Sequence, residues 1–522
     1  MRSGLTIPEL YRRCAGVLLG LLLGAYIVFN KPFALLGWPP LYIGEIVLAV
    51  ALPAVLFTFK TDILDQVRHN WGLSLLAAFF AYGAGRVIYD FPTYGMWAPR
   101  DGVLAGYALL AVLAPALWRP PPLVEGVPNP RRIALAQRVW LALIPISVLA
   151  VYWALAVSPA KGWIKLDAPP WKDTKPDFVT LATAVAAWIF FVSALRFNPL
   201  KPGSSRVLRV ALMLVFGAAA AYAAALMLNL PTRAVWVSAV PLAGLCFILL
   251  PTTRATQTTF AVIAAIAVLA GGIYVLPKVS AQATTLGEKY EVGKNLDWSI
   301  ADLERRLREK PETYPEFSVD LDLANLDPVA KRERIGSLLN PDEESFKTVA
   351  GRRGAHANTW RLVFWQRAIN YTRYHAPWTG IGFGPNVTNV NRESPAWPMY
   401  IPAMSLGSRS PHSAHLSVFV RLGYIGLALW IGILVATILS VVGALWRFRT
   451  NADDAAGSEE FRTLHRGRFF DLFALFGVWL IYLCTMSFSV TIENPMGGMP
   501  FWALTGVLLI ASGRERSGLS EL

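Results

Sequence analysis

Long apolar runs recur along this chain and constrain its fold more than any other feature. Hydrophobic residues make up 55% of the 522 residues, charged residues only 16%, and the mean hydropathy is +0.44, unlike a soluble domain of this size. About 20 residues of helix cross the hydrocarbon core of a bilayer. The backbone finds no water there, so apolar runs without strand alternation must be helical. The sequence therefore predicts an all-α, polytopic membrane protein.

We predict about twelve transmembrane helices, which puts both termini on the same side of the membrane. With the termini inside, the inner loops carry 21 Lys and Arg residues and the short outer loops carry eight. Lys and Arg concentrate in loops that stay in the cytoplasm, so the bias predicts cytoplasmic termini. The predicted spans are 14–29, 41–58, 72–85, 102–117, 139–157, 178–195, 210–229, 234–250, 258–276, 416–442, 470–490 and 500–512. The N-terminal run is expected to be a retained first span rather than a cleaved signal peptide.

This topology divides the chain into three parts. Residues 1–277 hold transmembrane helices 1–9, residues 278–415 form one large outer, periplasmic loop, and residues 416–522 hold helices 10–12 and a cytoplasmic C-terminus. Within the loop, Trp360–Tyr371 has the spacing of an amphipathic helix with enough apolar surface to dock on the membrane face. That helix is expected to end at Pro377, before a tight turn at Gly380-Ile381-Gly382-Phe383-Gly384.

The distribution of charge argues against a nucleic-acid-binding protein, and the positions of the cysteines argue against a cysteine-ligated metal site. The net charge is +14, but the basic residues lie in short loops between apolar runs, which argues against nucleic acid as a partner. The three cysteines, Cys14, Cys246 and Cys484, fall inside apolar runs without metal-ligand spacing. They are expected to be small core residues.

The strongest candidate site is Pro411-His412-Ser413-Ala414-His415-Leu416, where the outer loop becomes span ten. An ionisable group at the membrane boundary must be solvated, paired or directed into a cavity. His412 can take or relay a proton near neutral pH. Alternatively, it only hydrogen-bonds loop carbonyls. His415 lies one helical step away, but no acidic or cysteine partner at ligand spacing accompanies the two histidines, so we expect no metal site.

Two arginines on the outer side are further candidates. Arg233 lies in a very short turn between two apolar spans, and its permanently charged, planar fork of donors suits phosphate oxygens. The alternative for Arg233 is an arginine that reaches out to the membrane surface. Arg361 shares a helix face with Trp365, and the alternative for both is a helix that anchors on lipid.

Other charged residues have no predicted catalytic role. Arg86, Asp90, Arg100 and Asp101 bracket an outer loop, where they can pair with one another. Glu45 lies inside span two and is expected to face the bundle interior. Glu493 lies in the last outer loop.

Three motifs together resemble the superfamily of O-antigen ligases and polymerases, which are bacterial membrane glycosyltransferases. Thr232-Arg233-Ala234 resembles its Ser-Arg-Gly/Ala turn. Arg361-x-x-x-Trp365-x-x-Ala368, followed by Pro377–Gly384, resembles its Arg/Trp helix and Pro-Leu-x-Gly-x-Gly segment. Residues 411–427 resemble its His-Asn-x-Tyr-Leu…Gly-Leu-Ile-Gly-Leu stretch, with Ser413 in place of the usual Asn and His415 in place of the usual aromatic residue. The order of the motifs and the large loop before the histidine also agree.

The resemblance implies an inverting transfer, with no metal or other cofactor, from an undecaprenyl-diphosphate-linked glycan to a saccharide acceptor such as lipid A-core or a growing polysaccharide. It also implies a place in the bacterial inner membrane. Arg233 and Arg361 would stabilise the charge on the leaving diphosphate. His412 would orient or deprotonate the acceptor hydroxyl, or contact the diphosphate. The residues that would contact substrate are Trp365, His415, Gly382 and Gly384.

The sequence leaves several functions open. Within the superfamily these are a ligase, a polymerase and a protein O-oligosaccharyltransferase. The rival from another class is a polysaccharide transporter or flippase, because twelve spans with cytoplasmic termini are also common there. Transporters often have two homologous halves and membrane helices interrupted near the midplane, and the sequence clearly shows neither.

Overall fold

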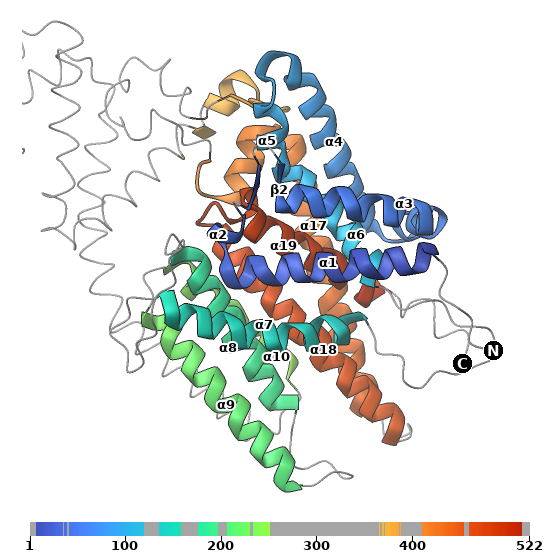
Figure 1. Ribbon diagram of the computed structural model, residues 1–522, viewed down its shortest axis with the longest axis vertical. Helices are drawn as coiled ribbons and strands as arrows, with labels where there is room; N and C mark the ends of the chain where they lie inside the picture. The colour runs from blue at the N-terminus through green and yellow to red at the C-terminus, as the bar shows by residue number, and fades with distance from the viewer. Residues whose placement is uncertain are drawn as a thin grey trace, which may run out of the picture.

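The structure is a computed structural model that describes most of the predicted spans and a part of the outer loop. The described residues are 7–34, 36–38, 41–118, 135–157, 176–196, 206–229, 233–250, 365, 368–369, 371–385, 387, 410–453 and 459–513. Nearly all of them are helical (Figure 1). The exception, apart from turns, is a small antiparallel hairpin of β1, Gly37–Trp38, and β2, Leu41–Tyr42.

The helices follow one another in this order along the described chain. They are α1 Ile7–Phe29, α2 Lys31–Ala34, α3 Ile43–His69, α4 Trp71–Tyr94, α5 Trp97–Gly106, η1 Tyr107–Leu109, α6 Leu110–Trp118, α7 Leu135–Val157, α8 Pro176–Arg196, α9 Arg206–Asn229, η2 Arg233–Ser238, α10 Ala239–Leu249, α17 Ala414–Asp453, α18 Glu459–Met486, η7 Thr491–Glu493 and α19 Pro495–Gly513.

Among the described residues, nine helical segments are long and apolar enough to cross a membrane. This confirms the prediction of an all-α, polytopic membrane protein. Each predicted span overlaps a described helix except 258–276, which lies outside the described residues. Most of the predicted outer loop, 278–415, also lies outside them, so the division into three parts stays a prediction.

Helix α19 lies at the centre of the bundle, where it contacts α1, α4, α6, α17 and α18. Trp430 of α17, Trp479 of α18 and Trp502 of α19 are fully buried there. The ring centroids of Trp430 and Trp502 lie 5.5 Å apart, and Trp430 and Trp479 both pack on Phe501. The indole N–H of Trp479 donates to the hydroxyl of Thr505 over 2.9 Å, so its polar atom is satisfied. Helices α7, α8 and α9 lie below α1 and α19 in the view of Figure 1, and α7 and α8 pack against α18.

The two ends of helix α4 contact different parts of the structure. At its start, the side chain of Asn70 caps the helix and donates to the carbonyl of Leu509 near the end of α19, over 3.1 Å. Its other end extends well beyond the predicted limit at residue 85, as far as Tyr94. The extension carries an ion pair at i,i+4 spacing between Arg86 and Asp90, which lets two charged residues continue an otherwise apolar helix. The candidate site lies at this second end.

Glu45 is half-buried, and its expected orientation toward the bundle interior stays a prediction. Glu45 lies in the first turn of α3, and its carboxylate accepts the backbone N–H of Tyr42 over 3.1 Å. Acidic side chains stabilise helix N-termini in this way because the first N–H groups have no helical partner. Glu45 therefore caps its own helix.

Candidate active site

Helix α17 is interrupted near its start, at Gly423. Gly423 has φ 65° and ψ −161°, a conformation that is open almost only to glycine. The break removes helical hydrogen bonds on both sides, so the backbone groups there need other partners. No sequence pattern predicts this break, which lies near the start of the helix.

Residues 377–385, which we call the glycine turn, supply the missing partners. The N–H groups of Ile381 and Gly382 donate to the carbonyls of Val420 and Arg421, over 2.8 and 3.1 Å. In return, the N–H groups of Tyr424 and Ile425 donate to the carbonyls of Pro377 and Trp378, over 2.8 and 3.3 Å. The turn has positive φ at Gly380, Gly382 and Gly384, which confirms the predicted tight turn. It therefore docks into the broken helix through a complete exchange of backbone bonds.

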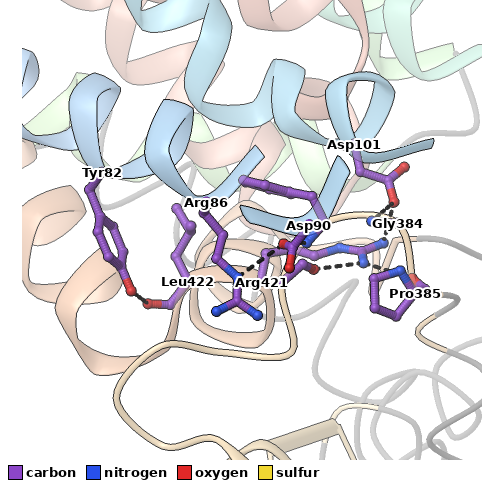
Figure 2. A network of polar contacts seen from close by, with 10 residues as sticks. Tyr82, Arg86, Asp90, Asp101, Gly384, Pro385, Arg421 and Leu422 are labelled. Atoms are coloured by element: carbon purple, nitrogen blue, oxygen red, sulfur yellow. Dashed lines mark hydrogen bonds and ion pairs between the residues drawn. The ribbon is translucent and has the colours of Figure 1, made fainter. Parts of the chain in front are cut away.

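A buried arginine, Arg421, ties the turn to a third element (Figure 2). Its side chain is only 4% exposed. Nη1 donates to the carbonyls of Gly382 and Pro385, over 3.1 and 2.7 Å, and Nη2 pairs with the carboxylate of Asp101 on α5 over 3.1 Å. Asp101 also accepts the N–H of Gly384 over 3.1 Å. A charge away from water requires such partners, so α5, α17 and the glycine turn are held as one unit.

A second carboxylate holds the same turn from α4. Asp90 is 3% exposed and accepts the N–H of Phe383 over 2.7 Å and Nε of Arg86 over 3.0 Å (Figure 2). The predicted pairing of outer charges is thus confirmed for Arg86 and Asp90. Asp101 pairs with Arg421 instead, and Arg100 lies over the ring of Trp97 at 4.7 Å.

His412 precedes the first residue of α17, Ala414, by two positions and has a constrained conformation. Its φ is 58°, which is uncommon for a residue other than glycine and occurs often at functional sites. Its N–H donates to Oγ of Ser410 over 3.1 Å. The indole N–H of Trp365 donates to the carbonyl of Pro411. The structure therefore brings Trp365 beside the backbone that carries His412.

Glu493, from η7, completes this region. Its carboxylate accepts the hydroxyl of Ser410 over 2.8 Å and that of Ser417. Burial, the largest effect, raises the pKa of Glu493 to about 7, against the lowering effect of the two serines and Arg421. The hydroxyl of Ser410 links this carboxyl group to the backbone of His412. With a pKa near neutral pH, Glu493 is a candidate member of a proton-transfer site.

His415 faces the bundle. Nδ1 of His415 accepts the indole N–H of Trp430 over 2.9 Å, which leaves the ring proton on Nε2 in the neutral form. Nε2 then donates to the hydroxyl of Ser487 over 2.9 Å, and that hydroxyl donates to the carbonyl of Leu483. Both ring nitrogens of His415 are used inside the protein, while the predicted contact with substrate stays a prediction.

The segment around Trp365 packs on α17. Ala368 is buried against Phe419 and Val420, and Trp365 and Ile369 pack beside them. The predicted amphipathic helix thus has its described part docked on the protein. Arg361 lies outside the described residues. The backbone of Arg233 begins η2, which packs against α18 and α8, so the predicted convergence of both arginines with His412 stays a prediction.

Comparison with known proteins bears on this region. The sequence description of the O-antigen ligase family matches residues 217–431. We call residues 217–431, which match the sequence description of this family, the O-antigen ligase domain. The match confirms the resemblance that the motifs indicate, and no curated protein matches the chain significantly. The O-antigen ligase domain begins in α9, contains the glycine turn and His412, and ends in α17. Three carboxylates that hold its site come from outside it: Asp90, Asp101 and Glu493.

The sequence held one signal for Arg421 that the motifs alone do not use. Arg421 is the single charged residue in the predicted span 416–442. A charged residue within a span is by default a candidate for a site and requires a partner. Which partner it has depends on how α5 packs, and no local pattern shows that.

Proposed function

We propose that the protein is a membrane glycosyltransferase that moves a glycan from an undecaprenyl-diphosphate carrier to a saccharide acceptor, either lipid A-core or a growing polysaccharide. The proposal places the site on the periplasmic face of the bacterial inner membrane, with both termini in the cytoplasm. The observation that supports it most is that the O-antigen ligase domain spans 217–431 and includes Arg233, Arg361 and His412.

The chemistry requires one bond to form as another breaks. The acceptor hydroxyl attacks the anomeric carbon, the bond from that carbon to the diphosphate oxygen breaks, and the configuration inverts. Negative charge then grows on the lipid diphosphate. Fixed guanidinium groups at the membrane surface stabilise such charge most in the transition state. We assign this role to Arg233 and Arg361, so that the step needs no metal.

His412 is assigned to the acceptor. The hydroxyl must lose its proton as it attacks, and an imidazole accepts a proton at neutral pH. Ser410 holds the N–H of His412 and donates to Glu493, which orients the loop that carries the ring. We further assign contacts with substrate to Trp365, His415, Gly382 and Gly384.

The test uses membranes that contain full-length protein, supplied with lipid-linked glycan and acceptor. We expect His412→Ala and Arg361→Ala to lower transfer by about a hundredfold or more, since each removes a group that acts in the transition state. His375→Ala is the matched control, because His375 lies on the same outer segment, is exposed and stacks on Tyr371. Wild-type transfer by both site variants, at unchanged protein level, would show that this mechanism is wrong.

A deletion strain separates the two acceptors. Unpolymerised single repeats would indicate a polymerase, whereas long chains left on undecaprenyl would indicate a ligase. If glycan instead failed to reach the periplasmic face, the protein would be a transporter, and the proposed reaction would be refuted.

A further inference from the structure

The protein orients the guanidinium of Arg86 through its Nε atom and leaves the two terminal nitrogens unbound within the described part of the chain. It projects from the last turns of α4 toward the glycine turn, and its side chain is 19% exposed. Nε pairs with Oδ2 of Asp90 over 3.0 Å. Asp90 is itself buried and fixed by the N–H of Phe383 over 2.7 Å. One edge of the guanidinium is therefore anchored to a carboxylate that cannot move without breaking the turn.

The glycine turn is shaped to receive this group. A Cβ atom on Gly382 would lie 2.5 Å from Nη2 and 2.8 Å from Nε of Arg86. Only a glycine therefore leaves room for the guanidinium against the backbone of the turn. Cζ of Arg86 lies over the ring of Tyr89, 5.2 Å from its centroid, a cation–π contact that further fixes the plane of the fork.

Its two terminal nitrogens remain open. Figure 2 shows both directed away from Asp90. Among the residues that the structure describes, neither terminal nitrogen has a hydrogen-bonding or ionic partner. Arg421 is the contrast at the same turn, because its terminal nitrogens are bound to Asp101 and to two carbonyls. Two adjacent, oriented N–H edges are the arrangement that binds phosphate oxygens in pairs.

We propose that Arg86 binds the phosphate group of a lipid through its two terminal nitrogens, and that this lipid is the diphosphate-linked carrier. The inference rests on the proposed function for the identity of the lipid. It adds a residue from α4, outside the O-antigen ligase domain, to the groups that hold the leaving diphosphate. Asp90 is the positioning residue, because it touches Arg86 and the turn.

The experiment measures binding of undecaprenyl diphosphate to the purified full-length protein in detergent micelles, with undecaprenol as the ligand that lacks phosphate. We expect Arg86→Gln to raise the Kd for the diphosphate by about ten- to a hundredfold, the contribution of a pair of charged hydrogen bonds, and to leave the Kd for undecaprenol unchanged. Arg86→Lys keeps the charge but not the planar fork of donors, so its Kd should lie between those of the wild type and Arg86→Gln. Arg100→Gln, an outer arginine that stacks on Trp97, is the control and should bind as wild type.

The outcomes separate this proposal from the proposed function. An unchanged Kd for Arg86→Gln, in a protein that still transfers glycan, overturns the role of Arg86 and leaves the function intact. An equal loss of affinity for phosphatidylglycerol vesicles overturns the carrier as the ligand in favour of bilayer headgroups. Wild-type protein that binds the diphosphate through Arg86 but transfers no glycan supports phosphate binding and refutes the transferase. Thermal unfolding of each variant checks that a loss of binding is not a loss of fold.

Discussion

Replacing Gly423 with alanine should destabilise the protein by about 2–4 kcal/mol, because the break in α17 depends on glycine. The conformation at φ 65° and ψ −161° costs an alanine roughly 1–3 kcal/mol. The added Cβ would also meet the carbonyl group of Trp378 and the backbone nitrogen of Gly380. The variant must therefore either keep the break under strain or straighten the helix.

A straightened α17 would not recover the stability that the substitution removes. The N–H groups of residues 424 and 425 would return to the carbonyls of residues 420 and 421, which now accept from the glycine turn. The N–H groups of Ile381 and Gly382, and the carbonyls of Pro377 and Trp378, would then lose their partners. The balance is about two hydrogen bonds, each contributing about 0.5–1.5 kcal/mol, together with the cost of any group left buried without a partner. A strained break and a straightened helix should therefore lower the free energy of unfolding by similar amounts.

The assay is chemical unfolding in mixed micelles, combined with hydrogen exchange at the amides of Ile381 and Gly382. The control is Gly443→Ala in the same helix, where an added Cβ meets nothing within 4 Å and alanine should stabilise by up to about 1 kcal/mol. The two substitutions should thus have opposite signs. If Gly423→Ala unfolded like Gly443→Ala and its turn amides exchanged no faster, the interrupted helix would not be the structural basis of the site.

Two further predictions concern the carboxylates around the site. Asp101→Asn leaves the buried guanidinium of Arg421 without its counter-charge, so the free energy of unfolding should fall by about 3 kcal/mol; a melting curve equal to wild type would refute this. Glu493 has a pKa raised to about 7, so the folded state holds its proton more tightly than the unfolded state. Stability should therefore be greatest below about pH 4.5 and fall as the pH rises through about 7, by up to about 3 kcal/mol in total. Glu493→Gln should lose this slope in apparent melting temperature between pH 4.5 and 8, and a slope that persisted would exclude Glu493 as its source.

The fold could be predicted from the sequence because the bilayer leaves few alternatives. An apolar run of sufficient length has only the helix available to it, so the class of fold follows from hydropathy alone. The ends of the helices were harder to predict than their existence. The extension of α4 to Tyr94 depends on the ion pair between Arg86 and Asp90, which lowers the mean hydropathy of that segment while it stabilises the helix.

The candidate site could be predicted only as far as its motifs are local. The positions of its glycines predict the turn at Gly380–Gly384, and the structure confirms it. The break at Gly423 was not predicted, because glycine is frequent in transmembrane helices and most of the surrounding span is apolar. What makes Gly423 different is the turn that docks against it, and that turn is a tertiary contact.

Arg86 and Arg421 have the same chemistry, and their environments give them different roles. Each arginine has an aspartate as its partner: Asp90, with a side chain 4% exposed, for Arg86, and Asp101, with a side chain 9% exposed, for Arg421. Arg421 contributes both terminal nitrogens to this framework and is almost fully buried, so it has no donor to offer a ligand. Arg86 contributes only Nε and keeps its terminal nitrogens open. Removing Arg421 should therefore reduce stability first and ligand affinity as a consequence, whereas removing Arg86 should reduce affinity for phosphate in a protein that still folds.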